Sequence, residues 1–460
     1  MKEAMMRIVT ANDESEVAVV VSPHDKASAL EALAKEDGYS SFAAYCTDRG
    51  WSLQKGLDMF KATPVYEEVD VPLLSGNLHL SIHSHHEDWP LQRLSDFGAR
   101  ANPKRGFLIV SKVLGRHIPA CPSDFRQAMN DLSDMLPSQL PGPVLIVGMA
   151  ETATALGQGV HAGYVGGTGR DDVYYVQSTR QVDWNTPLLA FEEAHSHATS
   201  HLILQPRTAE MREVYRTART LIIVDDECST GNTFLESATA LLKVMPAVQR
   251  IETAVLTDWS GGEYLDRMPR PATRHYLLAG KLTWTPDPEA VARAALAASS
   301  NGHGKAPKSG TPARYGIRDP HEGVPPQREL LYDLTGRRVL VLGECEFTYP
   351  ALLLAEKLAD AGNDVRIQAI TRSPVMEGGA IGDTAHFDDP YGSGAPCFLY
   401  NALTPTYDDV VVVSEVGRTT SDVKVLSNLR DRTTRVFGVV YQWDLDPAID
   451  AVNQLMNGKQ

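Results

Sequence analysis

Short apolar runs alternate with longer stretches of helical periodicity through most of the chain. Four of these runs, at 144–147, 173–176, 221–224 and 251–256, are rich in β-branched residues and are separated by helix-like segments. Strands that are apolar on both faces and alternate with helices form parallel sheets. Residues 75–296 are therefore expected to form an α/β domain with a parallel sheet.

A second alternation of strands and helices follows a segment of different composition. Residues 297–327 are rich in Ser, Gly, Pro and Lys and have no apolar period, which is typical of a linker. Beyond this segment we expect a helix and four strands, at 351–361 and at 338–342, 365–370, 410–413 and 436–441. Residues 328–460 are therefore expected to form a second α/β domain.

The first 74 residues are expected to be an N-terminal extension without chemistry. They contain a short apolar run at 17–21 and a helix-like stretch at 26–60. No apolar run follows a basic region at the start, and no stretch of about 18 uncharged apolar residues occurs in the chain. These features disfavour secretion and membrane spanning.

Net charge and cysteine spacing disfavour some classes of protein and of site. The formal net charge of -15 argues against binding to a nucleic-acid backbone, which requires clustered Lys and Arg. The five cysteines are scattered and form no CxxC pair, so their spacing indicates neither a disulfide framework nor a zinc site. A cytoplasmic protein is the simplest expectation.

The clearest chemical motif follows the third apolar run. Asp225 and Asp226 end the run, and residues 229–233 (Ser-Thr-Gly-Asn-Thr) open the next helix. Gly231 permits a tight turn, and the unpaired N–H groups of the new helix suit a phosphate. The carboxylates suit ribose hydroxyls and a magnesium ion held by phosphate oxygens. Ribose, phosphate and Mg²⁺ together describe 5-phosphoribosyl 1-diphosphate (PRPP). The alternative is an ordinary strand-to-helix turn capped by Ser229.

The segments that follow the runs 144–147 and 173–176 should lie at the same edge of the sheet as Asp225 and Asp226, because carboxyl ends of parallel strands lie together. The small-residue loop at 148–157 is of a kind that holds diphosphate through backbone amides, although close helix packing is the alternative. Arg180 follows the run 173–176, where a guanidinium could neutralise a departing diphosphate, although a surface arginine is the alternative. The expected PRPP-binding residues are Asp225, Asp226, Ser229, Thr230, Gly231, Asn232, Thr233, Ala150, Glu151, Thr152 and Ala153.

The acidic motif resembles the PRPP-binding motif of type I phosphoribosyltransferases, in which two acids contact ribose and loop amides hold the 5-phosphate. RANPKRGFLIVSKVLGRHIP at 100–119, AETA at 150–153 and EEAHSHA at 192–198 resemble the phosphoribosyltransferases of bacterial tellurite-resistance and stress gene clusters. Those proteins carry a C-terminal domain named for a Thr-Arg-Ser-Pro (TRSP) signature, which stands here at 371–374.

The resemblance covers roughly residues 75–455. It implies a type I phosphoribosyltransferase fold, with helices on both faces of a parallel sheet and a hood, followed by a second Rossmann-like α/β domain. It also implies Mg²⁺ as cofactor, a homodimer, and transfer of 5-phosphoribose to an unidentified small acceptor during synthesis of a nucleoside-like metabolite. A PRPP- or nucleotide-sensing regulator without turnover is the alternative function.

Two departures from better-known relatives bear on the acceptor and the acid-base chemistry. Purine-salvage enzymes have an acid where Ser229 stands, which disfavours a 6-oxopurine acceptor. Orotate enzymes use a lysine on a mobile loop, whereas residues 181–205 contain no lysine and carry His195, His197 and His201. These histidines could move a proton or bind diphosphate, or they could form a solvated face or a transition-metal site. The catalytic candidates are Asp225, Asp226, Arg180, His195 and His197.

Further candidates lie near the N-terminal side of the first domain and in the second domain. Lys112, Arg116 and His117 resemble a basic stretch that covers the acceptor in orotate enzymes, and a dimer contact is the alternative. In the second domain, polar loops at 343–350 and 383–391 should flank the TRSP turn and form a ligand cleft. Its candidate residues are Glu344, Thr371, Arg372, Ser373 and Asp388. Cys345 is expected to be a small buried residue, and a catalytic thiol is the alternative.

Overall fold

The computed structural model of the chain describes residues 4–10, 16–21, 34–35, 40–48, 60–65, 67–100, 105–181, 187–192, 200–287, 289, 310–322, 335–391, 394–402, 406–415, 433 and 435–440.

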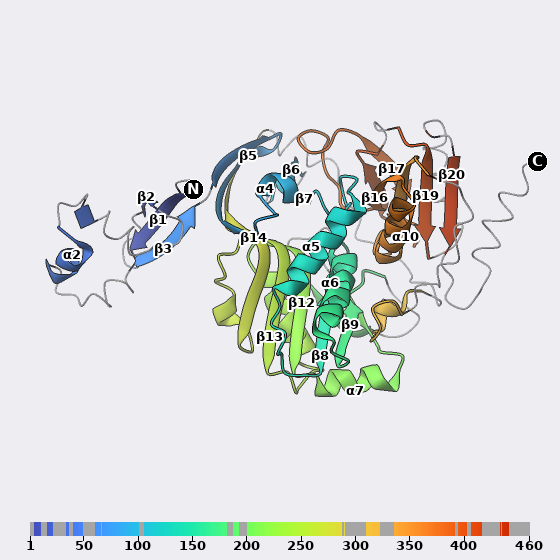
Figure 1. The fold of residues 1–460 in the computed structure, drawn as a ribbon, viewed down its shortest axis with the longest axis horizontal. Helices are drawn as coiled ribbons and strands as arrows, with labels where there is room; N and C mark the ends of the chain where they lie inside the picture. The colour runs from blue at the N-terminus through green and yellow to red at the C-terminus, as the bar shows by residue number, and fades with distance from the viewer. Residues whose placement is uncertain are drawn as a thin grey trace, which may run out of the picture.

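A seven-stranded sheet with the order β4-β5-β14-β13-β12-β8-β9 forms the centre of the molecule (Figure 1). Five neighbouring strands are parallel, namely β14 (Ala272–Pro286), β13 (Arg250–Asp258), β12 (Thr220–Cys228), β8 (Val144–Gly148) and β9 (Val173–Gln177). At one edge, β5 (Gly76–His85) and β4 (Glu67–Leu73) add antiparallel pairs that the sequence analysis did not predict. The predicted α/β fold with a mainly parallel sheet is confirmed.

The helices and the strand order locate a binding edge on this sheet. The helices α5 (Pro122–Asp134) and α6 (Ala153–Thr168) pack together over one face (Figure 1). The crossover from β12 to β13 runs in the opposite direction to that from β8 to β9, so right-handed connections place α8 (Asn232–Leu241) on the other face. The strand order reverses between β8 and β12, and ligands bind at the carboxyl ends of strands at such a point.

Smaller elements surround the central sheet. The helix α4 (Leu91–Leu94) precedes a hairpin of β6 (Ser95–Ala99) and β7 (Phe107–Ser111), while β10 (Pro187–Glu192) and β11 (Ser200–Leu204) form another hairpin. The helix α7 (Ala209–Thr217) and the short helix η1 (Leu265–Arg267) follow loops of the same domain. Near the N-terminus, β1 (Ala4–Thr10), β2 (Glu16–Val21) and β3 (Phe60–Val65) form a separate sheet, and α2 spans Phe42–Asp48.

A second, fully parallel sheet has the order β16-β15-β19-β20. Its strands are β15 (Arg338–Glu344), β16 (Asp364–Ile370), β19 (Asp409–Ser414) and β20 (Arg435–Val440), with helix α10 (Tyr349–Asp360) between the first two. All four predicted strands and the predicted helix are present. The expected polar loop at 383–391 instead contains β17 (Thr384–Asp388), which pairs with β18 (Pro396–Tyr400) because Ala385 and Phe387 are buried on one side.

The two sheets share a continuous hydrophobic core. Val339 and Val341 of β15 belong to the same cluster as the buried side chains of α5 and α6, whereas Leu340 and Leu342 face a second cluster under the β17–β18 hairpin. Ala120 and Ile367 exchange two backbone hydrogen bonds of 2.9 Å between the domains. This alternation explains why β15 is apolar at every position from 339 to 342.

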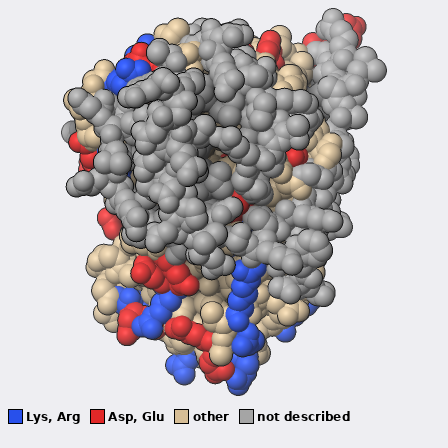
Figure 2. Space-filling view, turned by 90° about the vertical axis from the view of Figure 1, so that its right-hand side faces the viewer, with Lys and Arg blue, Asp and Glu red and all other residues tan. Residues whose placement is uncertain are grey.

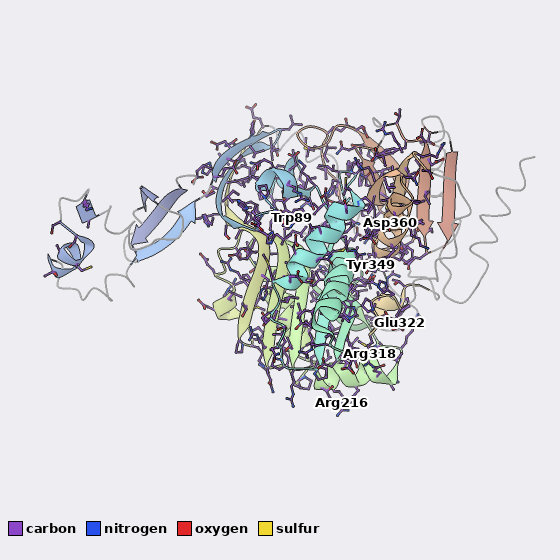
Figure 3. All side chains as sticks on the ribbon, in the orientation of Figure 1. Trp89, Arg216, Arg318, Glu322, Tyr349 and Asp360 are labelled. Carbon is purple, nitrogen blue, oxygen red and sulfur yellow. The ribbon has the colours of Figure 1, made fainter. Side chains whose placement is uncertain are left out.

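Helix α10 packs against α5 and α6 at this shared core. The ring of Tyr349, labelled in Figure 3, is almost fully buried there, and the Arg126 guanidinium lies 5.6 Å from its centroid. Arg126 also forms an ion pair with Glu356 at 2.7 Å. The two domains are therefore joined by apolar packing and by charged side chains.

Residues 310–322, within the segment 297–327 that was expected to be a linker, pack against the first domain. The short helix η2 (Pro312–Arg314) lies here, and Tyr315 and Ile317 are buried. The backbones of Ile317 and Tyr175 exchange hydrogen bonds of 2.8 and 2.9 Å, which attach the segment to the outer strand β9. Too few apolar residues occur here to produce a periodic pattern, so the sequence composition concealed the packing.

Acidic and basic side chains are mixed on the face shown in Figure 2, below the residues drawn in grey. Elsewhere in the described residues, Arg318 lies 3.5 Å from Asp171 and 3.6 Å from Glu210. Among the described residues, no helix is both long enough and apolar enough to cross a membrane.

Candidate functional site

The acidic pair lies where the sheet order reverses. Asp225 and Asp226 are half-buried near the end of β12, and the Asp226 N–H donates to Asp225 Oδ1 at 3.0 Å. The chain then turns at Gly231, whose φ of 76° lies in the left-handed region. A Cβ at this position would lie 2.1 Å from Cγ of the Tyr264 ring, so only glycine fits both the conformation and the space.

The rest of the predicted loop leads directly into α8. Thr230 Oγ1 accepts a 3.4 Å hydrogen bond from the Asn232 N–H, and Asn232 Oδ1 accepts one of 3.4 Å from Arg267. Ser229, Asn232 and Thr233 are half-buried and Thr230 is exposed. The N–H groups at the start of this ten-residue helix give the loop the donors that an anion requires.

The loop after β8 lies beside the acidic loop. The Met149 N–H donates to Val224 O at 2.9 Å, which joins the ends of β8 and β12. The Ala150 N–H donates to Ser178 Oγ at 2.8 Å, and the peptide bond between Ala150 and Glu151 is cis. Thr152 and Ala153 start α6. The structure therefore brings both predicted PRPP-binding segments to one edge.

Arginines from both domains surround the Glu151 carboxylate. Arg116 forms an ion pair with Glu151 Oε2, and Arg372 of the second domain forms one with Oε1. The Glu151 side chain is only 11% exposed. Burial raises its pKa, but Arg372, Arg116 and Arg180 outweigh this effect and lower the pKa from 4.5 to about 2. This buried carboxylate is consequently ionised at neutral pH.

Arg180 lies beside the same loop, at the position that the sequence predicted. Its Nη2 donates to Ala150 O at 3.4 Å, and its backbone N–H donates to Glu346 Oε1 at 2.6 Å. Glu346 Oε2 also accepts from Thr179 Oγ1 at 2.6 Å and pairs with Arg314 at 3.3 Å. The end of β9 is thus fixed to the second domain by a buried carboxylate.

The basic residues expected to bind an acceptor have different partners in the structure, and their role stays a prediction. Lys112 Nζ donates to Gln92 O at 2.7 Å, away from the β8 loop. His117 is buried, with its ring centroid 5.5 Å from that of Tyr400. Arg116 pairs with Glu151 and donates a hydrogen bond to Cys345 O.

The expected histidine-rich segment is only partly described. His195 and His197 lie outside the described residues, and their predicted roles stay predictions. His201 lies on β11 and is buried, with Nδ1 3.0 Å from Ser178 Oγ. Its ring stacks on Phe191 of β10 at a centroid distance of 5.1 Å. Because Ser178 also binds the Ala150 N–H, the β10–β11 hairpin is connected to the β8 loop.

The residues of the second domain that were expected to bind a ligand lie close to the first domain at the TRSP turn. Glu344 ends β15 and is fully buried, and Thr371 follows β16 and pairs with Phe398 through backbone hydrogen bonds. Ser373 Oγ accepts from Arg100 at 3.3 Å. Arg372 reaches Glu151, so the TRSP turn lies against the β8 loop rather than at a separate site. Asp388 ends β17, and its side chain lies outside the described residues.

Several charged contacts escaped the sequence analysis. Arg105, in the β6–β7 hairpin, forms an ion pair with Glu227 directly after the acidic pair. Arg314 is fully buried and pairs with Glu346 and Glu415, although it lies in the segment interpreted as a linker. The partners in these pairs are far apart in the sequence, so no local pattern predicts the pairs. The basic residues around position 105 were the one sequence feature that could have indicated the contact of Arg105.

Comparisons with solved structures find proteins of related type. An adenine phosphoribosyltransferase from Rhodothermus marinus is 16% identical, with a TM-score of 0.27 over 41% of this chain and 94% of that one. An orotate phosphoribosyltransferase from Aeropyrum pernix is 18% identical, with a TM-score of 0.25 over 40% and 85%. An adenine phosphoribosyl transferase from Trypanosoma brucei, in complex with AMP, pyrophosphate and ribose-5-phosphate, is 12% identical, with a TM-score of 0.28 over 46% and 86%.

Comparison of the sequence with models of protein families gives two matches. No curated protein matches the sequence. The family described as phosphoribosyl transferase matches residues 94–280, and the TRSP domain, described as C-terminal to that transferase, matches residues 313–429. The first match contains both loops of the site, and the second contains Arg372 and the buried Arg314. The chain thus carries a phosphoribosyl transferase domain match over residues 94–280, followed by a TRSP domain match over residues 313–429.

Proposed function

We propose that the chain transfers the 5-phosphoribosyl group of PRPP to a small acceptor and releases diphosphate. The observation that carries this proposal is the position of Asp225 and Asp226. Both carboxylates lie near the carboxyl end of a parallel strand at the point where the sheet order reverses, and a glycine turn and a helix N-terminus follow this strand.

The acidic loop would hold the ribose phosphate. Asp225 and Asp226 would accept hydrogen bonds from the ribose hydroxyls, because ionised carboxylates are acceptors. The amides of residues 229–233 would donate to the 5-phosphate at the N-terminus of α8. The tight turn at Gly231 supports this arrangement, because it brings the amides close to the carboxylates.

A magnesium ion fits this set of residues. Two half-buried carboxylates at one strand end offer the oxygen ligands that Mg²⁺ prefers, with phosphate oxygens of PRPP supplying the rest. When bound, the ion would neutralise charge on the diphosphate. The protein side chains would orient the ribose and hold the phosphate.

The β8 loop would hold the diphosphate. During transfer, the bond from C1 of the ribose to the diphosphate oxygen breaks and the diphosphate leaves with the bonding electrons. A bond from the acceptor to C1 then forms, and the acceptor loses a proton. Arg180 beside Ala150, together with Arg116 and Arg372 around Glu151, provides positive charge where negative charge develops.

The second domain is part of this proposal, since Arg372 lies at the diphosphate loop. We propose that the TRSP turn takes part in binding PRPP or in handling the product, and that Lys112 and His117 contact the acceptor only after rearrangement. His195 and His197 remain candidates for the proton transfer. The shared core argues that both domains must be present in any test of activity.

Release of diphosphate from PRPP tests the function. The full chain is incubated with PRPP, Mg²⁺ and fractions of a metabolite extract, and diphosphate is measured enzymatically. Acceptor-dependent release that disappears in Asp225→Asn/Asp226→Asn supports the transferase. Binding of PRPP without release in any fraction would identify a sensor instead.

Mass spectrometry of the same reactions tests the part played by the second domain. We expect Arg372→Ala to change the product profile or its rate of formation. An unchanged profile formed at the wild-type rate would exclude the TRSP turn from the chemistry.

A further inference from the structure

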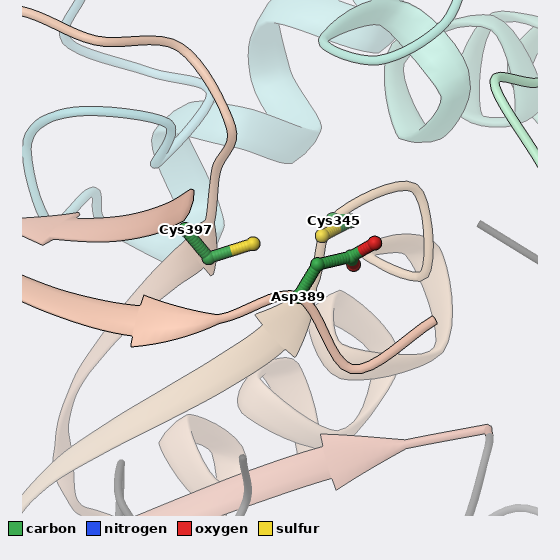
Figure 4. Close-up of side chains that lie close together, drawn as sticks. All are labelled: Cys345, Asp389 and Cys397. Carbon is green, nitrogen blue, oxygen red and sulfur yellow. The ribbon is translucent and has the colours of Figure 1, made fainter. Parts of the chain in front are cut away.

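Three buried side chains with metal-binding atoms lie together in the second domain. Cys345, Asp389 and Cys397 each offer one ligand atom, and these atoms all lie within 4.8 Å of one another (Figure 4). Cys345 and Cys397 are 0% exposed and Asp389 is 5% exposed. Figure 4 shows the two thiols directed toward each other from different elements, with the carboxylate beside Cys345.

The backbone holds each of the three positions in place. Cys345 directly follows β15, its N–H donates to Ile370 O at 3.0 Å, and its φ of 49° is unusual for a residue other than glycine. Cys397 lies in β18 opposite Phe387 of β17. Asp389 follows β17, and its Oδ1 accepts the Tyr391 N–H at 3.1 Å. The three donors are therefore preorganised by a strand end and a hairpin.

Packing alone accounts poorly for this set of side chains. Two buried cysteines can act as small apolar residues, and both lie in the hydrophobic cluster under the β17–β18 hairpin. A carboxylate adds nothing to apolar packing and must be compensated when it is taken out of water, and the Tyr391 N–H supplies one hydrogen bond here. Two sulfurs and one oxygen within reach of one point are instead a ligand set for a metal ion.

We propose that Cys345, Cys397 and Asp389 bind one zinc ion, with the fourth coordination position open to water or another ligand. Thiolates select Zn²⁺ over Mg²⁺ or Ca²⁺, and carboxylate oxygen completes many zinc sites. Zinc ligands lie about 2.0 to 2.3 Å from the metal in a tetrahedron, which places them about 3.5 Å apart. The three ligand atoms lie within 4.8 Å of one another, so side-chain movements that bring them closer together would complete the geometry.

The charges around the cluster suit this ion. Two thiolates and one carboxylate carry three negative charges, and Zn²⁺ neutralises two of them. Arg372, whose main ionic partner is Glu151, is also close enough to Cys345 and Asp389 for both to affect it electrostatically.

The site also borders the proposed diphosphate loop. Cys345 O accepts a 2.7 Å hydrogen bond from Arg116 Nη1, and the same guanidinium binds Glu151. A metal that fixes Cys345 would therefore help to fix Arg116. The zinc site does not depend on the proposed transferase function, since its ligands all belong to the second domain.

Metal analysis of the full chain tests the proposal. The protein is purified under reducing conditions without chelators, and its zinc content is measured by mass spectrometry of the elements. We expect about one zinc ion per chain, loss of zinc in Cys345→Ser/Cys397→Ser, and retention of zinc in Cys121→Ser, a matched change of a cysteine in the first domain. Substitution by Co²⁺ should give a thiolate-to-cobalt charge-transfer absorption.

Measurements on the unaltered chain keep the proposal falsifiable if the serine variants fail to fold. Zinc titration of metal-free wild-type protein against a chromophoric chelator requires no variant, and Asp389→Asn provides a milder change of shape. Absence of zinc binding in that titration overturns the proposal. A Cys345–Cys397 disulfide in the purified protein, detected as a peptide pair that reduction separates, also overturns it.

Discussion

Glu151→Gln removes the charge around which arginines of both domains gather, while keeping the size of the side chain. The pKa of Glu151 falls from 4.5 to about 2 in the folded chain, which corresponds to about 3 kcal/mol of stabilisation at neutral pH. We therefore expect the variant to lose about 3 kcal/mol of unfolding free energy at pH 7. Arg116 and Arg372 would then be buried without their carboxylate.

The pH dependence of this loss follows from the direction of the pKa shift. A carboxylate whose pKa is lowered by folding contributes its full stabilisation above its unfolded pKa, and the contribution disappears as the pH falls through the folded pKa. The difference between wild type and Glu151→Gln should hence be complete above about pH 5 and shrink to about half by pH 3.

Urea unfolding followed by circular dichroism at several pH values measures this difference. Glu356→Gln is the control, because its ion pair with Arg126 also joins the two domains but its side chain is 25% exposed. We expect that control to lose at most about 1 kcal/mol. Equal losses for both variants at pH 7, or a loss that does not change with pH, would refute the reasoning.

A double-mutant cycle isolates the contact between the domains. Glu151→Gln and Arg372→Gln, combined, should cost less than the sum of the single changes by about 1 to 3 kcal/mol. Additive effects would show that the ion pair contributes nothing to docking of the TRSP domain.

Three further changes test other parts of the structure. Gly231→Ala should lower the unfolding free energy by at least about 2 kcal/mol in thermal unfolding, because the site requires positive φ and leaves no room for a Cβ. Arg314→Met should cost about 3 to 5 kcal/mol in urea unfolding, because it leaves Glu346 and Glu415 buried without the guanidinium. Burial lowers the pKa of His161 from 6.5 to about 4, so His161→Gln should lessen the loss of stability between pH 6.5 and pH 4 in a pH series of thermal unfolding.

Matched controls accompany these variants. Gly169 also has positive φ but has no atom within 4 Å of a built Cβ, so Gly169→Ala should cost less than Gly231→Ala. Arg366 is 37% exposed, and Arg366→Met should change stability by less than about 1 kcal/mol. Equal effects within either pair, or an unchanged pH profile for His161→Gln, would contradict the structural account.

The elements that could be predicted from the sequence are those with a clear pattern of apolar residues within a short stretch of the chain. Strands buried on both faces read as continuous apolar runs, so β8, β12, β13 and β15 were recognisable from composition alone. The strand β5, which lies between β4 and β14, alternates instead, with Leu78, Leu80 and Ile82 buried between more polar residues, and this weaker pattern was not recognised. In β17, two buried residues were too few to reveal a strand.

The same distinction holds for the candidate site. Asp225, Asp226 and Gly231 occupy one continuous motif, so their chemistry could be inferred without any tertiary information. The ion pair between Arg372 and Glu151 joins residues 221 positions apart, and no local pattern encodes it. Cys345 and Cys397 lie in different elements that only the folded sheet and hairpin bring together.

Calorimetric titration of the full chain with PRPP in the presence of Mg²⁺ tests the central claim, that the acidic pair in β12 and the loop after it bind PRPP. Each charged hydrogen-bonding group contributes about 1.5 to 3 kcal/mol, so Asp225→Asn/Asp226→Asn should weaken binding by about two orders of magnitude or more. Asp171→Asn, which changes an aspartate that is 90% exposed, should leave the affinity unaltered. Wild-type affinity in the folded double variant would contradict the account.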